Sequence, residues 1–250
     1  MIQLLEQLRQ EQIPIISGGI PLDNLFSYYR LDGDATDSKG TNDATGLNMT
    51  YPTGQKMGTN CGDFTSAANN YIEIPDADAF SFTDGVNDRA GSISFYVKFD
   101  VATSTNVLIG KRGSTTNPPK EYNFIFSGGS LYWAIYSNNS GNNTVRVIYA
   151  WTPNLDQWYQ VVGTYDGSEV QGGINLYVDG VNVGSQATAG TYEGSTNTTA
   201  NVTLGGQGTS GDRINLFDGK LDGVGFWNKE LSQAEVTAIY DEQNLGNELI

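Results

Sequence analysis

Residues 156–180 have the sequence DQWYQVVGTYDGSEVQGGINLYVDG, and this stretch decides the fold. In its first half, every second side chain faces the same side of the chain, and around Leu176 apolar residues recur at every second position. A period of two is typical of a strand. Asp179-Gly180 follows the second run and precedes another apolar run, and Asp-Gly between two such runs is a strong hairpin signal. The stretch therefore predicts neighbouring antiparallel strands joined by tight turns.

The same period of two extends over most of residues 22–228. Turns rich in Gly, Asn and Ser separate the runs, and closely spaced strands of this kind favour an antiparallel sandwich over β-α-β units. The runs have these alternate apolar residues: Ile93, Phe95, Val97 and Phe99; Tyr122, Phe124 and Phe126; Leu131, Trp133 and Ile135; Val145, Val147 and Tyr149. We expect an all-β fold, an antiparallel two-sheet sandwich.

A short helix is expected at each end of the chain. Residues 1–12 carry apolar side chains at helical spacing and stop before Pro14, and a helix of this length must pack against something to be stable. Its contact is either its own domain or another subunit of a larger assembly. We expect residues 1–20 to be an N-terminal helix and linker that serves assembly or anchoring, and residues 21–250 to be the sandwich domain.

The C-terminal helix has a clear start signal. Ser232 and Glu235 have the spacing of a capping box, in which each side chain accepts a hydrogen bond from the other residue's backbone amide. Val236, Ile239 and Tyr240 then form an apolar face, and a helix that stops near residue 243 is predicted.

Composition excludes several chemistries. The chain of 250 residues has no His and one Cys, so it holds no Ser-His-Asp triad, no imidazole metal site, no internal disulfide and no cysteine-based zinc site. Its net charge of −15 opposes binding to nucleic acid and to anionic membranes. No apolar run is long enough to span a membrane, and the first residues do not match a classical signal peptide.

Six stretches, in this order, resemble the laminin G-like, concanavalin A-like jelly-roll domains of the lectin/glucanase superfamily. They are YYRLDGDATDSKG (28–40), DFTSAANNYIEIP (63–75), GSISFYVK (91–98), DQWYQVVGTYDG (156–167), INLYVDG (174–180) and FDGKLDGV (217–224) with the later Leu231, Ser232 and Glu235. The resemblance implies a two-sheet jelly roll. The chain departs from the family pattern at Phe95-Tyr96, where a Trp is usual, and at Tyr159-Gln160, where His is frequent.

A calcium site is the ligand site that the resemblance implies. The family frequently binds one structural calcium through its first loop and the Asp of its last strand, which corresponds here to Asp37 and Asp222. Asp32 or Asp34, and the carbonyl of Gly40, are further partners. Hard cations bind oxygen ligands, and this loop supplies three carboxylates. The alternative is that Asp37 forms an Asx turn and Asp222 hydrogen-bonds a neighbouring loop.

Aromatic residues gather in the middle of the chain, where Tyr132, Trp133 and Tyr136 are followed by Tyr149 and Trp151. Their rings are suited to stacking on sugars. An alternating strand with Trp inward and Tyr outward explains the same pattern. The sequence therefore leaves the sugar-binding residues unassigned.

Catalysis is not expected. Retaining glycosidases of this fold need two close carboxyl groups, and alternate acidic residues along one strand would supply them. The nearest stretch, residues 73–78, has Pro75 after its first Glu, which breaks the strand pattern.

The expected function is a non-catalytic surface module of a particle, a bacteriophage virion structural protein used as head decoration, fibre or spike. Residues 1–17 would contact other virion or particle proteins, a homo-trimer is the expected assembly, and cell-surface glycans are expected ligands. Two alternatives remain, a secreted or cell-surface carbohydrate-binding lectin-like module and a glycoside hydrolase. The expected location is a virion surface or the extracellular space, after synthesis without a classical signal peptide.

Overall fold

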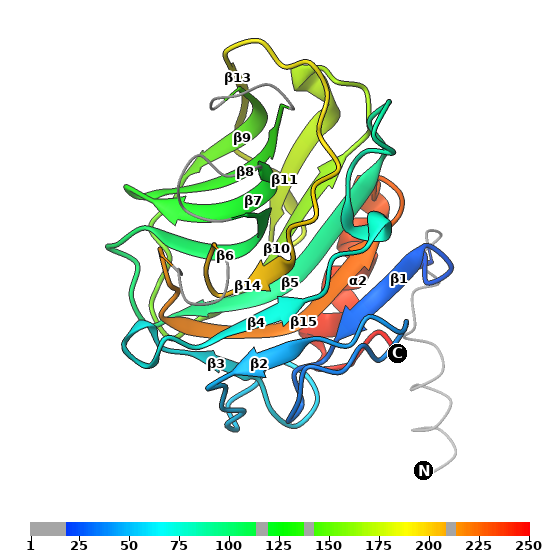
Figure 1. Cartoon of the computed structure of the whole chain (residues 1–250). Helices are drawn as coiled ribbons and strands as arrows, with labels where there is room; N and C mark the ends of the chain where they lie inside the picture. The colour runs from blue at the N-terminus through cyan, green and yellow to red at the C-terminus, as the bar shows by residue number, and fades with distance from the viewer. Residues whose placement is uncertain (1–18, 114–119, 138–142, 209–213) are drawn as a thin grey trace, which may run out of the picture.

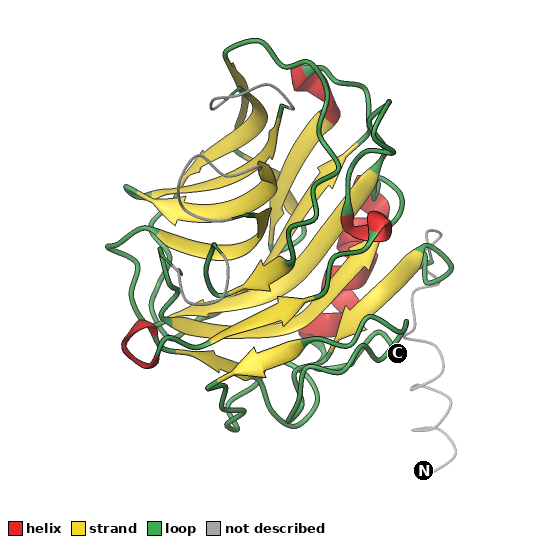
Figure 2. Ribbon diagram, in the orientation of Figure 1, coloured by secondary structure: helices red, strands yellow, loops and turns green. Residues whose placement is uncertain are grey.

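Two antiparallel sheets pack face to face, and one helix lies against the outer face of one sheet (Figure 1). The computed structural model describes residues 19–113, 120–137, 143–208 and 214–250. Strands and loops make up most of these residues (Figure 2). The expected all-β jelly-roll sandwich with a C-terminal helix is confirmed. The expected helix at residues 1–12 and the contacts of residues 1–17 lie outside the described residues.

The first sheet has seven strands within the described ranges and carries the helix. Its order is β1 (Leu25–Tyr29), β15 (Gly219–Trp227), β5 (Gly91–Phe99), β10 (Trp158–Tyr165), β11 (Ile174–Val178) and β12 (Val181–Val183), with β3 (Gly62–Phe64) also paired to β15. The predicted hairpin is confirmed at β11 and β12, where Asp179 and Gly180 have φ angles of 49° and 76° and Val178 pairs with Val181.

The second sheet has eight strands in the described part of the chain. Its order is β13 (Ser185–Ala189), β9 (Thr144–Ala150), β8 (Ser130–Tyr136), β7 (Lys120–Ser127), β6 (Asn106–Arg112), β14 (Val202–Leu204), β4 (Tyr71–Ile74) and β2 (Thr45–Leu47). Short 3-10 turns occur at Ser66–Ala68, Asp78–Phe80 and Gln171–Gly173.

Aromatic rings fill the space between the two sheets. Trp133 of β8 is fully buried and stacks on Phe124 of β7 with ring centroids 4.4 Å apart. Gly163 of β10 faces this stack from the other sheet. The alternation in β8 is confirmed, because Leu131, Trp133 and Ile135 belong to the core.

The helix α2 (Gln233–Asn244) covers the outer face of the first sheet. Ser232 and Glu235 form the predicted capping box, and Val236 and Ile239 pack in a cluster with Tyr28 of β1. The helix makes β5 different from a strand with only one buried face. Nearly all of β5 is buried on both faces, because α2 and the segment before it cover the side that would otherwise be exposed. No helix among the described residues has the length and apolar character needed to cross a bilayer.

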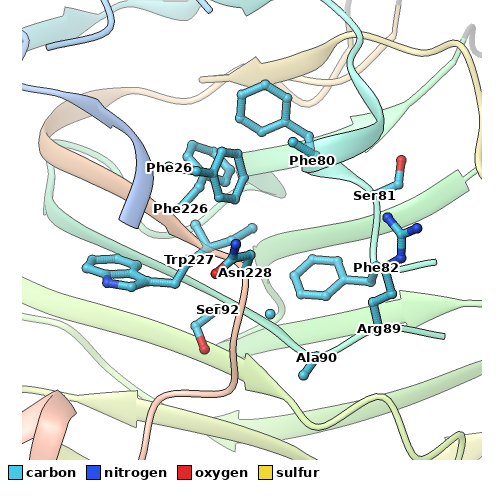
Figure 3. A pocket seen from close by; sticks show the side chains of 13 residues that line it. Phe26, Phe80, Ser81, Phe82, Arg89, Ala90, Ser92, Phe226, Trp227 and Asn228 are labelled. Atoms are coloured by element: carbon cyan, nitrogen blue, oxygen red, sulfur yellow. The ribbon is translucent and has the colours of Figure 1, made fainter. Parts of the chain in front are cut away.

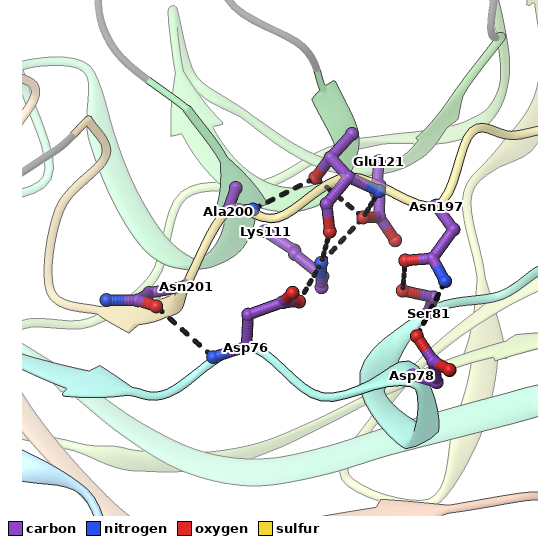
Figure 4. A network of polar contacts seen from close by, with 9 residues as sticks. Asp76, Asp78, Ser81, Lys111, Glu121, Asn197, Ala200 and Asn201 are labelled. Atoms are coloured by element: carbon purple, nitrogen blue, oxygen red, sulfur yellow. Dashed lines mark hydrogen bonds and ion pairs between the residues drawn. The ribbon is translucent and has the colours of Figure 1, made fainter.

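A buried charge cluster ties the segment before β14 to the second sheet (Figure 4). The ammonium group of Lys111 lies 2.6 Å from Glu121, 2.8 Å from Asp76 and 2.7 Å from the carbonyl oxygen of Thr198. Lys111 and Glu121 have fully buried side chains, so each charge depends on the other for compensation. The cluster therefore holds the segments around Asp76 and Thr198 against β6 and β7.

We predict that Gly163→Ala destabilises the protein. A Cβ atom there would lie 2.5 Å from Cζ of Phe124 and 2.8 Å from Cδ2 of Trp133, so the ring stack must move. Overpacking of this kind costs about 1–3 kcal/mol, which urea denaturation would measure as a lower midpoint. Gly172→Ala is the control, because a Cβ there meets nothing within 4 Å. Equal stability of the two variants would contradict this account of the core.

Candidate functional site

A pocket lies on the outer face of the second sheet, the face away from the core. It has a volume of about 340 Å³. We call it the tyrosine groove, and these residues line it: Thr105, Asn123, Ile125, Ser127, Tyr132, Ala134, Tyr136, Thr144 and Arg146. They come mainly from β7, β8 and β9, which are neighbours in the sheet.

The period of a strand explains how the two tyrosines reach this surface. Trp133 and Ile135 point into the core, so Tyr132, Ala134 and Tyr136 point the other way. Ala134 lies between the tyrosines and has a short side chain, which leaves space above it. The interpretation of Trp inward and Tyr outward is therefore correct for β8, and it also produces an open aromatic surface.

Pairing between the strands brings polar groups to the same place. In the register, Ala134 lies opposite Asn123 of β7 on one side and Arg146 of β9 on the other, and Tyr136 lies opposite Thr144. The Nδ2 of Asn123 donates to the Tyr136 hydroxyl at 3.0 Å, which fixes the position of that ring.

Three polar atoms of the groove lack a hydrogen-bond partner among the described residues. They are Oδ1 of Asn123, Oγ1 of Thr144 and Nε of Arg146. Asn123 is 1% exposed and Thr144 is 2% exposed, so bulk water reaches these side chains poorly. Buried polar atoms without partners are rare in folded proteins, and a polar ligand or bound water satisfies them.

A second pocket, of about 560 Å³, lies beside β1 and β15 (Figure 3). Phe26, Phe80 and Phe226 line it, and the rings of Phe80 and Phe226 meet edge to face at 5.0 Å. It is larger than the tyrosine groove, but the aromatic rings on its wall pack against each other. The one unpartnered buried polar side-chain atom among its lining residues is Nε1 of Trp227, whose ring packs in the α2 cluster. The tyrosine groove is therefore the better candidate for a polar ligand.

Asp37, the first predicted calcium ligand, is occupied by hydrogen bonds. Its Oδ1 accepts from the amides of Tyr28, Lys39 and Gly40, and its Oδ2 accepts from the Ser27 hydroxyl and the Asn42 amide. Burial alone would raise its pKa, but the donors from Gly40, Tyr28 and Ser27 lower the pKa below its ordinary value. These bonds include the Asx-type contacts of the alternative interpretation.

The other predicted ligands serve separate contacts. Asp32 accepts hydrogen bonds from the amides of Thr59 and Asn60, and exposed Asp34 accepts one from the amide of Thr36. Asp222 accepts from the amides of Lys56 and Met57, a neighbouring loop, while its Oδ1 has no partner. In the described ranges no three acidic or cysteine side chains form a group suited to a metal ion. The carboxylates of Asp37 and Asp222 therefore do not fit as ligands of one shared ion. Calcium binding stays a prediction that depends on Asp222.

The sequence named the two groove tyrosines but not their polar neighbours. Asn123, Thr144 and Arg146 are separated along the chain, and only the register of three strands brings them together. Their positions on the outward side of alternating strands were a usable signal. Which outward residues lie opposite each other could not be known without the turn lengths and bulges.

Comparisons with known proteins agree with this fold. The sequence profile of the concanavalin A-like lectin/glucanases superfamily, laminin G type 3, matches residues 66–237. The search among curated proteins found no match.

Similar solved structures include the receptor-binding domain of botulinum neurotoxin D, with a TM-score of 0.63, 14% identity, and 89% of this chain and 53% of that chain covered. The binding domain of Paraclostridial Mosquitocidal Protein 1 has a TM-score of 0.65 and 14% identity, with 88% and 52% covered. The botulinum neurotoxin serotype D ligand binding domain in complex with N-acetylneuraminic acid has a TM-score of 0.64 and 14% identity, with 88% and 51% covered. The chain spans about half the length of these structures, and at this identity the likeness shows the fold.

We predict a pH dependence of stability that is due to Asp222. This side chain is fully buried, and burial raises its pKa to about 8. The folded protein thus binds a proton that the unfolded chain releases near pH 4, so the free energy of unfolding decreases as the pH rises from about 4 to about 8. Asp222→Asn should flatten this slope in thermal melts, whereas Asp34→Asn should keep it. An unchanged slope in Asp222→Asn would contradict the raised pKa.

The same variant separates proton binding from calcium binding. A cation at Oδ1 would replace the proton, so calcium would raise the melting temperature of the wild type above that measured in EDTA, with no such effect in Asp222→Asn. Superimposable melts of the wild type in calcium and in EDTA would remove calcium from this site.

Proposed function

Because the chain belongs to the concanavalin A-like lectin/glucanase superfamily, we propose that it is a non-catalytic binding module that holds a saccharide in the tyrosine groove. The observation that carries this proposal is a pair of outward tyrosines with unpartnered polar atoms between them. Small-ligand sites combine apolar or aromatic walls with a few convergent polar groups, and the groove has this composition.

The spacing of the groove suits a sugar ring. Four residues along a strand span roughly 13 Å, so Tyr132 and Tyr136 stand apart at the two ends of the pocket, with Ala134 as the floor between them. A ring that enters this space contacts tyrosine on either side. Its hydroxyl groups then lie close to Asn123 and Thr144, whose unpartnered oxygens accept hydrogen bonds.

The absence of acidic groups in the groove supports binding without hydrolysis. Glycoside hydrolysis by the usual mechanisms needs two carboxyl groups that flank the bond to be cleaved. None of the residues that line the groove in the described part of the chain is Asp or Glu. A saccharide held there meets amide, hydroxyl and guanidinium groups, which bind and orient but do not supply the acid and nucleophile.

The structural neighbours support the same class of function without identifying the ligand. Those proteins are named as receptor-binding or ligand-binding domains, and one of them was solved with N-acetylneuraminic acid. This chain corresponds to about half of each, so the receptor and the sugar belong to those proteins as wholes. What they support here is a binding module of the jelly-roll type.

We also propose that the module is displayed on a particle such as a phage virion and is attached through residues 1–17. The described chain enters the fold at Gly19 and reaches β1, the outermost strand of the first sheet. The tyrosine groove lies on the outer face of the second sheet. Attachment beside β1 would therefore leave the groove open to a cell surface.

For saccharide binding, the test is a glycan array followed by affinity measurements on the best ligand. Tyr132→Ala and Tyr136→Ala should each weaken binding roughly tenfold or more, because each removes one wall of the site. Their melting temperatures should stay near that of the wild type, since both side chains are partly exposed.

Tyr240→Ala is the matched control, because this tyrosine lies on α2 at the outer face of the other sheet. It should bind as well as the wild type. Saccharide binding that survives both groove substitutions, or an array without any bound glycan, would contradict the proposal.

Attachment through the N-terminal segment has a separate test. If residues 1–17 mediate assembly, the full chain should sediment as an oligomer, with a trimer expected. Leu5→Glu combined with Leu8→Glu places charges on the predicted apolar helical face and should give a monomer with unchanged melting. A wild-type chain that sediments as a monomer at all concentrations would contradict self-assembly through this segment.

A further inference from the structure

Positive charge gathers around the tyrosine groove in a protein that is otherwise strongly acidic. The whole chain carries 28 acidic and 13 basic residues. Arg146 lines the groove, and the Lys120 ammonium lies 5.3 Å from the centroid of the Tyr136 ring. Arg112 is the strand partner of Lys120 and extends the same positively charged region across β6. Lys120 and Arg112 thus lie beside Tyr136, and Arg146 lines the same groove.

Four cations elsewhere in the described chain pair with carboxylates, namely Lys111 with Glu121, Lys220 with Asp63, Lys229 with Glu235 and Arg89 with Asp84. Arg112 and Arg146 differ from these four. Neither has a carboxylate within salt-bridge distance among the described residues, and the groove lining contains no acidic side chain.

The surroundings of Arg112 are consistent with an uncompensated charge. Its guanidinium donates to the neutral side-chain oxygen of Gln207 at 3.1 Å. Burial lowers the pKa of Arg112, and burial together with the nearby Arg112 charge lowers the pKa of Lys120. A partly buried cation without a counter-charge is costly, and an anion that binds beside it offsets the cost.

Among the three basic residues, Arg146 has the best geometry for direct contact with an anionic group in the groove. It lies opposite Ala134, the floor of the groove, and its Nε has no partner. A guanidinium offers a planar fork of donors that matches a carboxylate or sulfate group. Asn123 lies across Ala134 from Arg146, Thr144 lies two residues before Arg146 on β9, and both carry unpartnered oxygens that a sugar hydroxyl can approach.

We propose that the ligand of the tyrosine groove is an anionic saccharide, with its carboxylate or sulfate group on Arg146 and its ring between the two tyrosines. This inference rests on the proposed function and adds the chemical class of the sugar. The positive groove in an acidic protein favours a short or sparsely charged chain. A dense polyanion such as nucleic acid would be repelled by the net charge of −15 over the rest of the surface.

Matched pairs of oligosaccharides test the inference on the full-length protein by calorimetry. One pair is an oligohexuronate and the same compound with its carboxyl groups reduced to alcohols. The other is a sulfated oligosaccharide and its desulfated form, so that the two pairs distinguish the source of the charge. The acidic member of at least one pair should bind roughly tenfold tighter than its neutral partner, and added salt should reduce the difference.

Two variants with the same change of net charge locate the effect. Arg146→Gln should abolish the preference for the acidic member while the neutral partner still binds. Arg89→Gln should keep the preference, because Arg89 lies in the other pocket, beside Asp84.

Each contrary result has a distinct meaning. Equal affinity for acidic and neutral partners would overturn the anionic ligand and leave saccharide binding intact. Equal losses in the two Arg variants would overturn the role of Arg146, because net charge alone would then explain the preference. If no member of either pair binds, the inference fails, and the proposed function fails with it only when the glycan array also shows no bound glycan.

Discussion

The stack of Trp133 on Phe124, against Gly163 of the facing sheet, is the contact on which the rest of the structure depends. The indole ring has no exposed surface, and its Nε1 donates to the carbonyl oxygen of Thr164 at 3.2 Å. This fixes the side of β8 that faces the core. Because side chains of a strand alternate, Tyr132 and Tyr136 then have to face outward. One buried ring therefore determines where the exposed aromatic surface lies.

The two sheets use their outer faces differently. The apolar face of α2 packs in one cluster with residues of β1, β10, β11 and β15 of the first sheet, and β5 between β15 and β10 is also buried on both faces. Where the tyrosine groove lies, the described residues leave the outer side of the second sheet open, and polar atoms there have no partner among those residues. A sandwich that covers one sheet leaves the outer face of the other available to a ligand. This asymmetry supports the groove over the apolar pocket beside β15.

Much of this fold could be predicted from the sequence because its signals are local. The alternation around Trp133, the hairpin at Asp179-Gly180 and the capping box at Ser232 each depend on a few neighbouring residues, and all three are confirmed. The family resemblance came from the order of such signals.

What could not be predicted depends on contacts between distant segments. The burial of both faces of β5 results from the docking of α2, more than 130 residues later. The burial of Lys111 depends on Asp76 and Thr198, which come from opposite directions along the chain. The predicted role of Asp37 rested on the resemblance and on the three carboxylates of its loop. The five donors that surround its carboxylate are brought together by the loop conformation, which the sequence pattern does not reveal.

The central claim is that ligand binds on the outer face of β7, β8 and β9. The most direct measurement is a nuclear magnetic resonance titration of the isotope-labelled full-length protein with the saccharide that it binds best. The largest shifts are expected at the amides of Asn123, Tyr136 and Arg146, with little change beside α2. Shifts centred on Phe80 and Phe226, or on the loop around Asp37, would place the site elsewhere and contradict the account.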